Sequence, residues 1–191
     1  TGGHVFPALA VAEKLREKKV DVIWLGTKKG LEASVVPENG ISIEFIRVVG
    51  VRGKNILYWL KAPFLLLGAL VTVMQLIRRY EVAVVLGMGG YVSVAAGFAA
   101  VLTRKPLVLQ EQNAISGTAN RLLAPFARHI FTGFTGVFPG RENSKWSGNP
   151  LRREFLQSAE HVSVSAGGIN IFVVGGSLGA HALNNVVPKA I

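Results

Sequence analysis

The chain has 191 residues, half of them hydrophobic, and contains no cysteine, which favours a folded α/β protein and excludes disulfides and cysteine-ligated metals. Its 21 Lys and Arg residues against 11 Asp and Glu residues give a net charge of +10, so anionic partners are expected. Because the basic residues form short scattered pairs without interleaved aromatics, lipid or phosphate is favoured over nucleic acid.

Strand-like apolar runs alternate with helical patterns along the chain, which is typical of parallel βαβ units. A helix is predicted over 7–19, with Pro7 in its first turn, and a buried helix over 91–102. Strands are predicted at about 20–25, 42–46, 82–86, 106–109 and 129–132, with helices between them. The pattern therefore predicts a Rossmann-like fold.

The segment 56–77 is apolar except for Lys61, and it is too short in its charge-free part to cross a bilayer. Two interpretations remain open. The helix is buried on two sides, or it covers the core and also enters a membrane interface. In the second case Lys54, Lys61, Arg78 and Arg79 contact lipid headgroups.

The polar stretch 157–168 precedes a new apolar run at 169–174 and another glycine turn at 175–179. We therefore expect a first domain over 1–152, a linker over 153–168, and the start of a second Rossmann-like domain over 169–191. Because both ends of the sequence fall inside motifs, a piece of a longer protein is expected.

Three glycine turns, at 1–4, 87–91 and 175–179, each lie between an apolar run and a helical pattern or at a helix start. Such turns bring backbone N–H groups and the positive end of a helix dipole close to a ligand. Three of them in one chain predict a ligand, or two ligands, rich in phosphate.

His4 follows the first glycines, where a helix N-terminus disfavours the imidazolium, so it is expected to be neutral and available as a base. The run Gln110-Glu111-Gln112-Asn113 follows a predicted strand, at the edge where open α/β sheets bind ligands. Asp21 is the sole aspartate and carboxylates are not clustered, so neither a metal site nor a cofactor is expected.

The segments TGGHVFPALAVA, WLGT, GMGGYVS, EQN, GNPLR and VVGGSLGA, in this order and spacing, resemble the MurG family. The family comprises the UDP-N-acetylglucosamine–N-acetylmuramyl-(pentapeptide) pyrophosphoryl-undecaprenol N-acetylglucosaminyltransferases of bacterial peptidoglycan synthesis. The resemblance implies a GT-B fold of two Rossmann-like domains. It also implies inverting transfer of N-acetylglucosamine from its UDP donor to the 4-hydroxyl of the muramic acid of lipid I, which forms lipid II.

The resemblance also implies roles for particular residues. His4 is the preferred general base and Glu111 the alternative. The positions that resemble donor-binding residues are Thr1, Gly2, Gly3, Asn113, Arg152 and Ser177. Those that resemble acceptor-binding residues are His4, Gly89, Gly90, Tyr91, Glu111 and Gln112. The membrane-docking positions are Leu57, Trp59, Leu60, Lys61, Phe64, Leu65, Leu67, Arg78 and Arg79.

Two positions depart from the family pattern: Gln110 stands where histidine is usual, and Leu178 where glutamine is common. Glutamine can form hydrogen bonds but cannot act as a base, which puts proton transfer at position 110 in doubt. The resemblance implies a peripheral protein on the cytoplasmic side of the bacterial inner membrane. The alternatives are another GT-B glycolipid transferase and a non-catalytic module that binds lipid diphosphates; a nucleotide-binding oxidoreductase is disfavoured because Gly-x-Gly-x-x-Gly is missing from the first turn.

Overall fold

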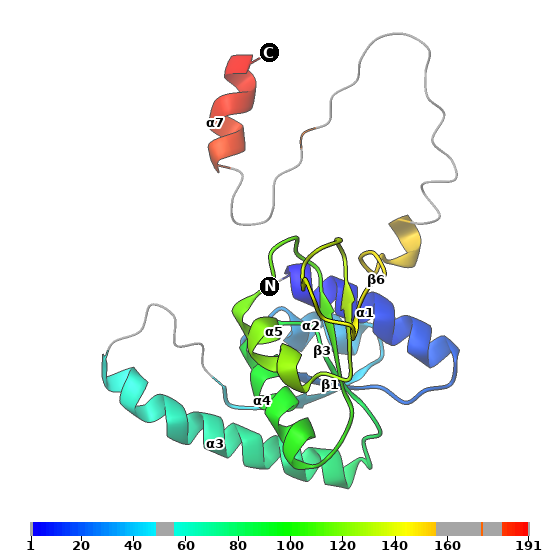
Figure 1. Cartoon of the computed structure of the whole chain (residues 1–191), viewed down its shortest axis with the longest axis vertical. Coiled ribbons are helices and arrows are strands. Elements are labelled where there is room, and N and C mark those ends of the chain that lie inside the picture. Colours follow the sequence, from blue (N-terminus) through cyan, green and yellow to red (C-terminus); the bar gives the residue numbers. More distant parts are fainter. Residues whose placement is uncertain (1, 49–55, 156–172, 174–180, 191) are drawn as a thin grey trace.

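The computed structural model describes residues 2–48, 56–155, 173 and 181–190 (Figure 1). Side chains are described from residue 64 in the third helix and from residue 184 in the last. The elements in chain order are α1 (Gly2–Glu17), β1 (Ile23–Gly26), α2 (Glu32–Glu38), β2 (Ser42–Phe45), α3 (Ile56–Arg79), β3 (Val85–Gly87), α4 (Gly90–Leu102), β4 (Leu107–Glu111), α5 (Thr118–Leu123), the 3₁₀ turn η1 (Ala124–Phe126), β5 (His129–Thr132), β6 (Ser144–Trp146) and α7 (His181–Ala190).

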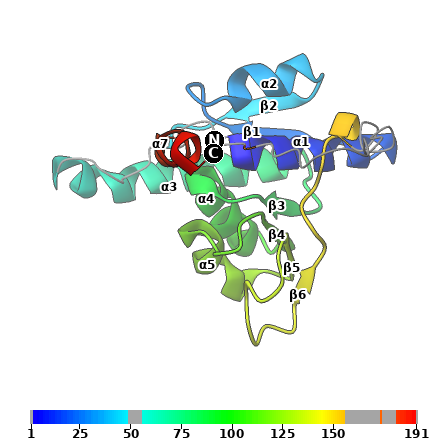
Figure 2. The same cartoon turned by 90° about the horizontal axis from the view of Figure 1, so that it is seen from above.

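All strand pairs in the described part of the chain are parallel, as the alternating pattern predicts. β1 pairs with β2, from Ile23 opposite Ser42 to Gly26 opposite Phe45. β3, β4, β5 and β6 follow one another in a four-stranded sheet, seen from above in Figure 2. The edge strand β6 was not predicted, because its three residues, Ser-Lys-Trp, carry no apolar alternation.

The first helix begins earlier than predicted. α1 starts at Gly2, so Pro7 lies inside the helix and not in its first turn. The proline is tolerated because its missing N–H removes only the bond to residue 3, and because Val5, Leu9 and Ala12 are buried as one continuous apolar face. His4 therefore belongs to the first helical turn.

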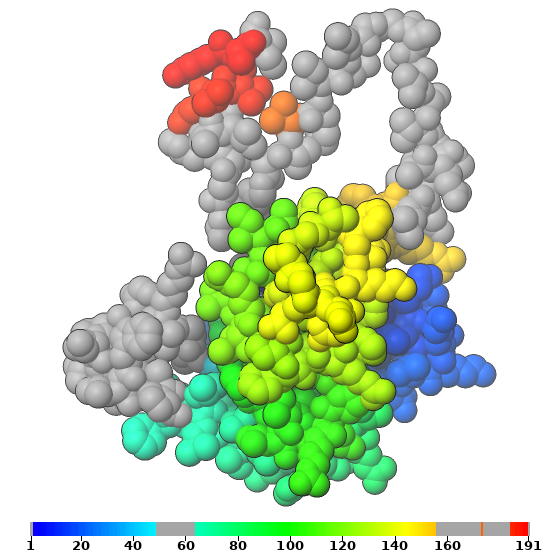
Figure 3. Space-filling view, viewed as in Figure 1, coloured from blue at the N-terminus to red at the C-terminus, as the bar shows by residue number. Residues whose placement is uncertain are grey.

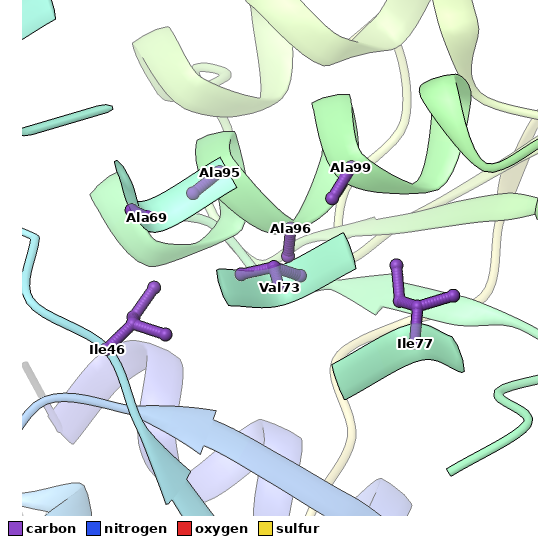
Figure 4. Packing of buried hydrophobic residues seen from close by; sticks show 7 residues of the cluster. All are labelled: Ile46, Ala69, Val73, Ile77, Ala95, Ala96 and Ala99. Atoms are coloured by element: carbon purple, nitrogen blue, oxygen red, sulfur yellow. The ribbon is translucent and has the colours of Figure 1, made fainter. Parts of the chain in front are cut away.

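Two helices pack closely through small side chains. Ala69, Val73 and Ile77 lie four residues apart on α3 and point toward the alanines of α4 (Figure 4). On α4 the partners are Ala95, Ala96 and Ala99, of which Ala95 and Ala99 are fully buried. This contact confirms that the helix predicted over 91–102 is buried, since six of its residues have little or no exposed surface.

The opposite face of α3 is exposed. Phe64, Leu67 and Val71 are 77%, 58% and 47% exposed. Burial on two sides, the first interpretation of this segment, is therefore wrong for the described residues. Among those residues, no helix is long and apolar enough to cross a membrane. Figure 3 shows the described side chains of α3 along the lower edge of the folded body.

Candidate functional site

The site begins where the first helical turn of α1, predicted as a glycine turn, meets the glycine turn before α4. A Cβ atom added to Gly89 would lie 2.8 Å from Nε2 of His4, so the imidazole packs directly on the Gly89 backbone. Gly89 has a φ of +93° and caps α4, which starts at Gly90. A side chain at residue 89 would be excluded by both its backbone conformation and this contact. The contact brings the first turns of α1 and α4 together. Two helix N-termini in one place are what a phosphate-binding site at these glycines requires.

His4 is half-buried in this contact. Burial lowers the pKa of its imidazole below the usual 6.5, while the nearby Glu111 carboxylate acts in the opposite direction. The net lowering keeps the side chain neutral near pH 7. A neutral imidazole at a helix N-terminus is able to accept a proton from a bound hydroxyl group.

Glu111 lies in β4, which extends two residues beyond its predicted end at residue 109 and includes Gln110. Its carboxylate is 1% exposed and accepts four hydrogen bonds. Oε1 accepts from the backbone N and the Nδ2 of Asn113, at 3.0 and 2.8 Å. Oε2 accepts from the Gly117 N and from Asn120 Nδ2, both at 2.9 Å.

This environment defines the role of Glu111. Burial by itself raises the pKa of the carboxyl, but the hydrogen bonds from Gly117, Asn113 and Asn120 outweigh it and lower the pKa. Because both oxygens are occupied, the geometry favours Glu111 as a positioning residue for the loop over 112–117. His4 is then the better placed of the two candidate bases.

Three amide side chains line the same edge of the sheet. Gln112 donates through Nε2 to the Met88 carbonyl at 3.1 Å, which ties the end of β4 to the second glycine turn. Asn120 is fully buried and also donates to the Gln110 carbonyl at 3.1 Å. The side-chain oxygens of Gln110, Gln112 and Asn120 have no donor among the described residues. They can therefore accept hydrogen bonds from hydroxyl or amide groups of a ligand, or from water.

The Gly-Asn-Pro turn closes the site from the far strand. Asn149 donates through Nδ2 to the Gln112 carbonyl at 3.0 Å, and its side chain lies over Gly133 at the end of β5. A Cβ on Gly133 would be 2.0 Å from Asn149 Oδ1, so only glycine permits this contact. Asn149, Gly133 and Asn120 were not predicted as site residues. Asn149 alone carries a sequence signal, an asparagine between glycine and proline in the GNPLR segment.

Arg152 stacks on an aromatic ring of the first helix. Its guanidinium carbon lies 4.6 Å from the centre of the Phe6 ring and 5.0 Å from that of Phe155. A Cβ on Gly2 would in turn contact Phe6 at 3.3 Å. Stacking leaves the N–H edge of the guanidinium available for bidentate binding of an oxyanion near the start of α1.

The structure thus brings most of the predicted donor and acceptor residues to one edge of the four-stranded sheet. Tyr91 is half-exposed in the first turn of α4, and Asn113 is exposed on the loop that Glu111 holds. Thr1 and Ser177 lie outside the described residues, as do the linker and the third glycine turn. In the described ranges no three His, Cys, Asp or Glu side chains group as metal ligands.

Comparison with known sequences gives a consistent result. Residues 1–132 match the model of the glycosyltransferase family 28 N-terminal domain. The chain is 50% identical over its whole length to UDP-N-acetylglucosamine–N-acetylmuramyl-(pentapeptide) pyrophosphoryl-undecaprenol N-acetylglucosamine transferases of Nitrosococcus oceani and Alkalilimnicola ehrlichii. It covers 54% of each relative, so the chain spans about half the length of the curated relatives it matches.

Comparison with solved structures agrees. The crystal structure of MurG from Acinetobacter baumannii is 36% identical, with a TM-score of 0.78 over the whole of this chain and 52% of that one. The Anabaena protein HepE, solved in complex with UDP, is 16% identical, with a TM-score of 0.54 over 78% of this chain and 41% of its own. The similarity to HepE shows a shared fold and nothing more.

Proposed function

The chain belongs to glycosyltransferase family 28, and since MurG transferases match it along its whole length, we propose that it forms the acceptor-binding half of a UDP-N-acetylglucosamine-dependent N-acetylglucosaminyltransferase. The α/β fold of parallel strands is that of GT-B glycosyltransferases, as predicted. The proposed reaction transfers N-acetylglucosamine to the 4-hydroxyl of the muramic acid of lipid I and forms lipid II.

The contact between His4 and Gly89 is the observation on which the proposal mainly depends. It joins a neutral imidazole to two helix N-termini in one place. A hydroxyl nucleophile needs a base, and general-base catalysis contributes about 10²–10⁴ in rate. A diphosphate needs N–H donors, and the first turns of α1 and α4 supply them.

In this mechanism His4 accepts the proton of the sugar hydroxyl as its oxygen attacks the anomeric carbon, and the bond to the UDP leaving group breaks on the opposite face. Glu111 holds the loop that carries Asn113, through the bonds to Asn113 and Gly117. Arg152, stacked on Phe6, is placed to stabilise the negative charge of the diphosphate. None of these steps requires a metal cofactor.

A transfer assay tests this function. A full-length transferase that contains this chain is given UDP-N-acetylglucosamine with radiolabelled sugar, and lipid I and diacylglycerol are offered side by side. We expect product on lipid I alone, with or without chelator, and a His4→Ala variant with a kcat lower by at least 100-fold but unchanged donor affinity. Transfer to diacylglycerol would indicate a different glycolipid transferase. Strict dependence on a divalent metal would refute the metal-free mechanism.

We further propose that α3 docks the protein on the cytoplasmic face of the inner membrane. Phe64, Leu67 and Val71 form an exposed apolar stripe, and Arg78 lies on the same helical face, as expected for an interfacial helix beside anionic lipid. Leu65 is also exposed, and Arg79 stacks on Tyr80. The side chains of Leu57, Trp59, Leu60 and Lys61 lie outside the described residues.

Vesicle sedimentation tests the docking surface. The double variant Phe64→Ser/Leu67→Ser should bind vesicles of phosphatidylglycerol and phosphatidylcholine at least tenfold more weakly, because both side chains lose their apolar burial in lipid. Leu122→Ser on α5 is the control, since Leu122 is also half-exposed but lies away from the stripe. Equal losses of vesicle binding in the double variant and in Leu122→Ser would refute docking through α3.

A further inference from the structure

The loop between β1 and α2, residues 27–31, closes around one carboxylate. Glu32, the first residue of α2, accepts two hydrogen bonds through Oε1 from Thr27, one from the backbone N and one from Oγ1, both at 3.0 Å. Thr27 itself is buried. The two bonds join the start of the loop to its end, so a single side chain sets the path of the backbone between them.

Two glycines leave room for this carboxylate. A Cβ atom added to Gly30 would lie 2.1 Å from Oε2 of Glu32, and one added to Gly26 would lie 2.7 Å from its Cγ. Both distances are far below van der Waals contact, so neither position accepts a side chain while Glu32 keeps its place. Burial raises the pKa of Glu32, but hydrogen bonds from its own backbone and from Thr27 outweigh it and lower the pKa. The carboxylate is therefore charged near neutral pH.

Stabilisation of the helix alone does not explain this arrangement. A carboxylate in the first turn of α2 interacts favourably with the helix dipole whatever its side chain contacts. Glu32 instead turns back toward the loop, where a buried threonine and two glycines accommodate it. The arrangement therefore fixes the position of the loop.

The loop ends against the start of α1. A Cβ atom added to Gly2 would lie 3.9 Å from Cδ2 of Leu31 and 3.3 Å from the ring of Phe6, so these two side chains lie against the same side of Gly2. Arg152 stacks on the Phe6 ring at 4.6 Å. Figure 2 shows α2 beside α1, and the two helices share a buried apolar cluster. The loop thus reaches the place where Arg152 meets the first helix.

We propose that Glu32 is a positioning residue for donor binding: it holds the loop over 27–31 so that Leu31 fixes the Phe6 ring on which Arg152 stacks. The proposal rests on the proposed function, in which Arg152 and the first turn of α1 bind the diphosphate of the sugar nucleotide. Release of the loop displaces Arg152 and weakens the binding of the donor and of the transition state alike. Such a loss raises KM for the donor and leaves kcat unchanged. His4 is held separately by its contact with the Gly89 backbone.

Four variants of a full-length transferase that contains this chain test the role. Glu32→Ala removes the acceptor, whereas Glu32→Gln keeps Oε1 toward Thr27 and replaces only Oε2 by an NH₂ group. Leu31→Ala removes the contact with α1 but leaves both hydrogen bonds in place. Glu38→Ala, at the exposed far end of α2, is the matched control. Each variant is measured for Tm, for kcat and KM with both substrates, and for the Kd of UDP-N-acetylglucosamine by calorimetry.

We expect Glu32→Ala and Leu31→Ala to raise the KM and the Kd of the donor about tenfold, the loss that corresponds to one hydrogen bond to a charged group, with kcat within about twofold. Glu32→Gln and Glu38→Ala should bind the donor within about twofold of the original enzyme, since the bonds to Thr27 remain. A Glu32→Ala enzyme with a lower Tm and an unchanged KM for the donor would show a structural role only and would overturn the proposal. A Glu32→Gln enzyme that binds the donor as weakly as Glu32→Ala would overturn it too.

The calorimetric arm separates this proposal from the proposed function. If the original enzyme binds UDP-N-acetylglucosamine but transfers nothing to lipid I, the proposed function fails, while a higher Kd in Glu32→Ala still supports the positioning role. If the original enzyme transfers the sugar and all four variants bind the donor equally well, the positioning role fails and the function stands. An original enzyme that does not bind the donor overturns both.

Discussion

The buried carboxylate of Glu111 offers the sharpest test of the site's construction. Glu111→Gln keeps the shape of the side chain but replaces one acceptor oxygen by an NH₂ group. With Oε1 retained toward Asn113, the new amide nitrogen faces two donors, the Gly117 N and Asn120 Nδ2, each now 2.9 Å from Oε2. A donor facing a donor cannot form a hydrogen bond, so both contacts are lost or must rearrange.

The magnitude follows from these contacts. Hydrogen bonds to a charged group contribute about 1.5–3 kcal/mol each, and Asn120 can recover part of its loss by rotating its amide, so the expected destabilisation is about 3 kcal/mol. In a chain of this length that corresponds to a Tm lower by about 6–12 °C. Thermal unfolding followed by circular dichroism measures it. Glu142→Gln is the control, because Glu142 is exposed and should change Tm by less than 2 °C.

The pH dependence provides a second measurement on the same variant. The pKa of Glu111 in the folded protein is below its ordinary value of 4.5, so its carboxylate stabilises the fold fully above that pH. The contribution is lost as pH falls through the lowered folded-state pKa. The difference in Tm between the original chain and Glu111→Gln should therefore be constant near neutral pH and shrink below about pH 4.5. If the Tm of Glu111→Gln at pH 7 lies within 2 °C of that of the original chain, the role of Glu111 as the positioning residue for the loop over 112–117 is refuted.

Two further predictions concern His4. Gly89→Ala places a Cβ 2.7 Å from the imidazole Cδ2 and should abolish transfer by the full-length enzyme. Gly136→Ala, at a φ of +73° with open space around it and outside the site, should only lower Tm, because it adds backbone strain without a contact. Equal activities in the two variants would refute the packing argument. Because burial lowers the pKa of His4, kcat/KM should stay constant down to a lower pH than a histidine with the ordinary pKa of 6.5 would allow. A decrease in kcat/KM that begins above pH 6.5 would contradict this prediction.

The parallel α/β fold was predictable because the helices and the strands other than β6 carry apolar patterns. The polar run after a strand predicted a site at the carboxyl edge of the sheet, with Glu111 and Gln112 in it, and the glycine turn before the first helix predicted His4. Tertiary contacts determined the rest. α1 starts at Gly2 and Val5 is buried in its apolar face, whereas Pro7 led the sequence pattern to predict a helix that starts at residue 7. The roles of Asn120 and Asn149 depend on partners 10 and 37 residues away, which no local spacing encodes.

The position of Gln110 is consistent with the departure from the MurG pattern, because the base that we propose is His4 and not residue 110. Its side chain is 4% exposed, and its Nε2 lies 3.5 Å from Asn149 Oδ1, so it faces the Gly-Asn-Pro turn from within the sheet. A side chain at this depth supports Asn149, which in turn holds the Gln112 carbonyl. Hydrogen bonding is sufficient for that task, and glutamine provides it as well as histidine does. In the proposed mechanism proton transfer remains with His4, whose half-buried ring packs on the Gly89 backbone.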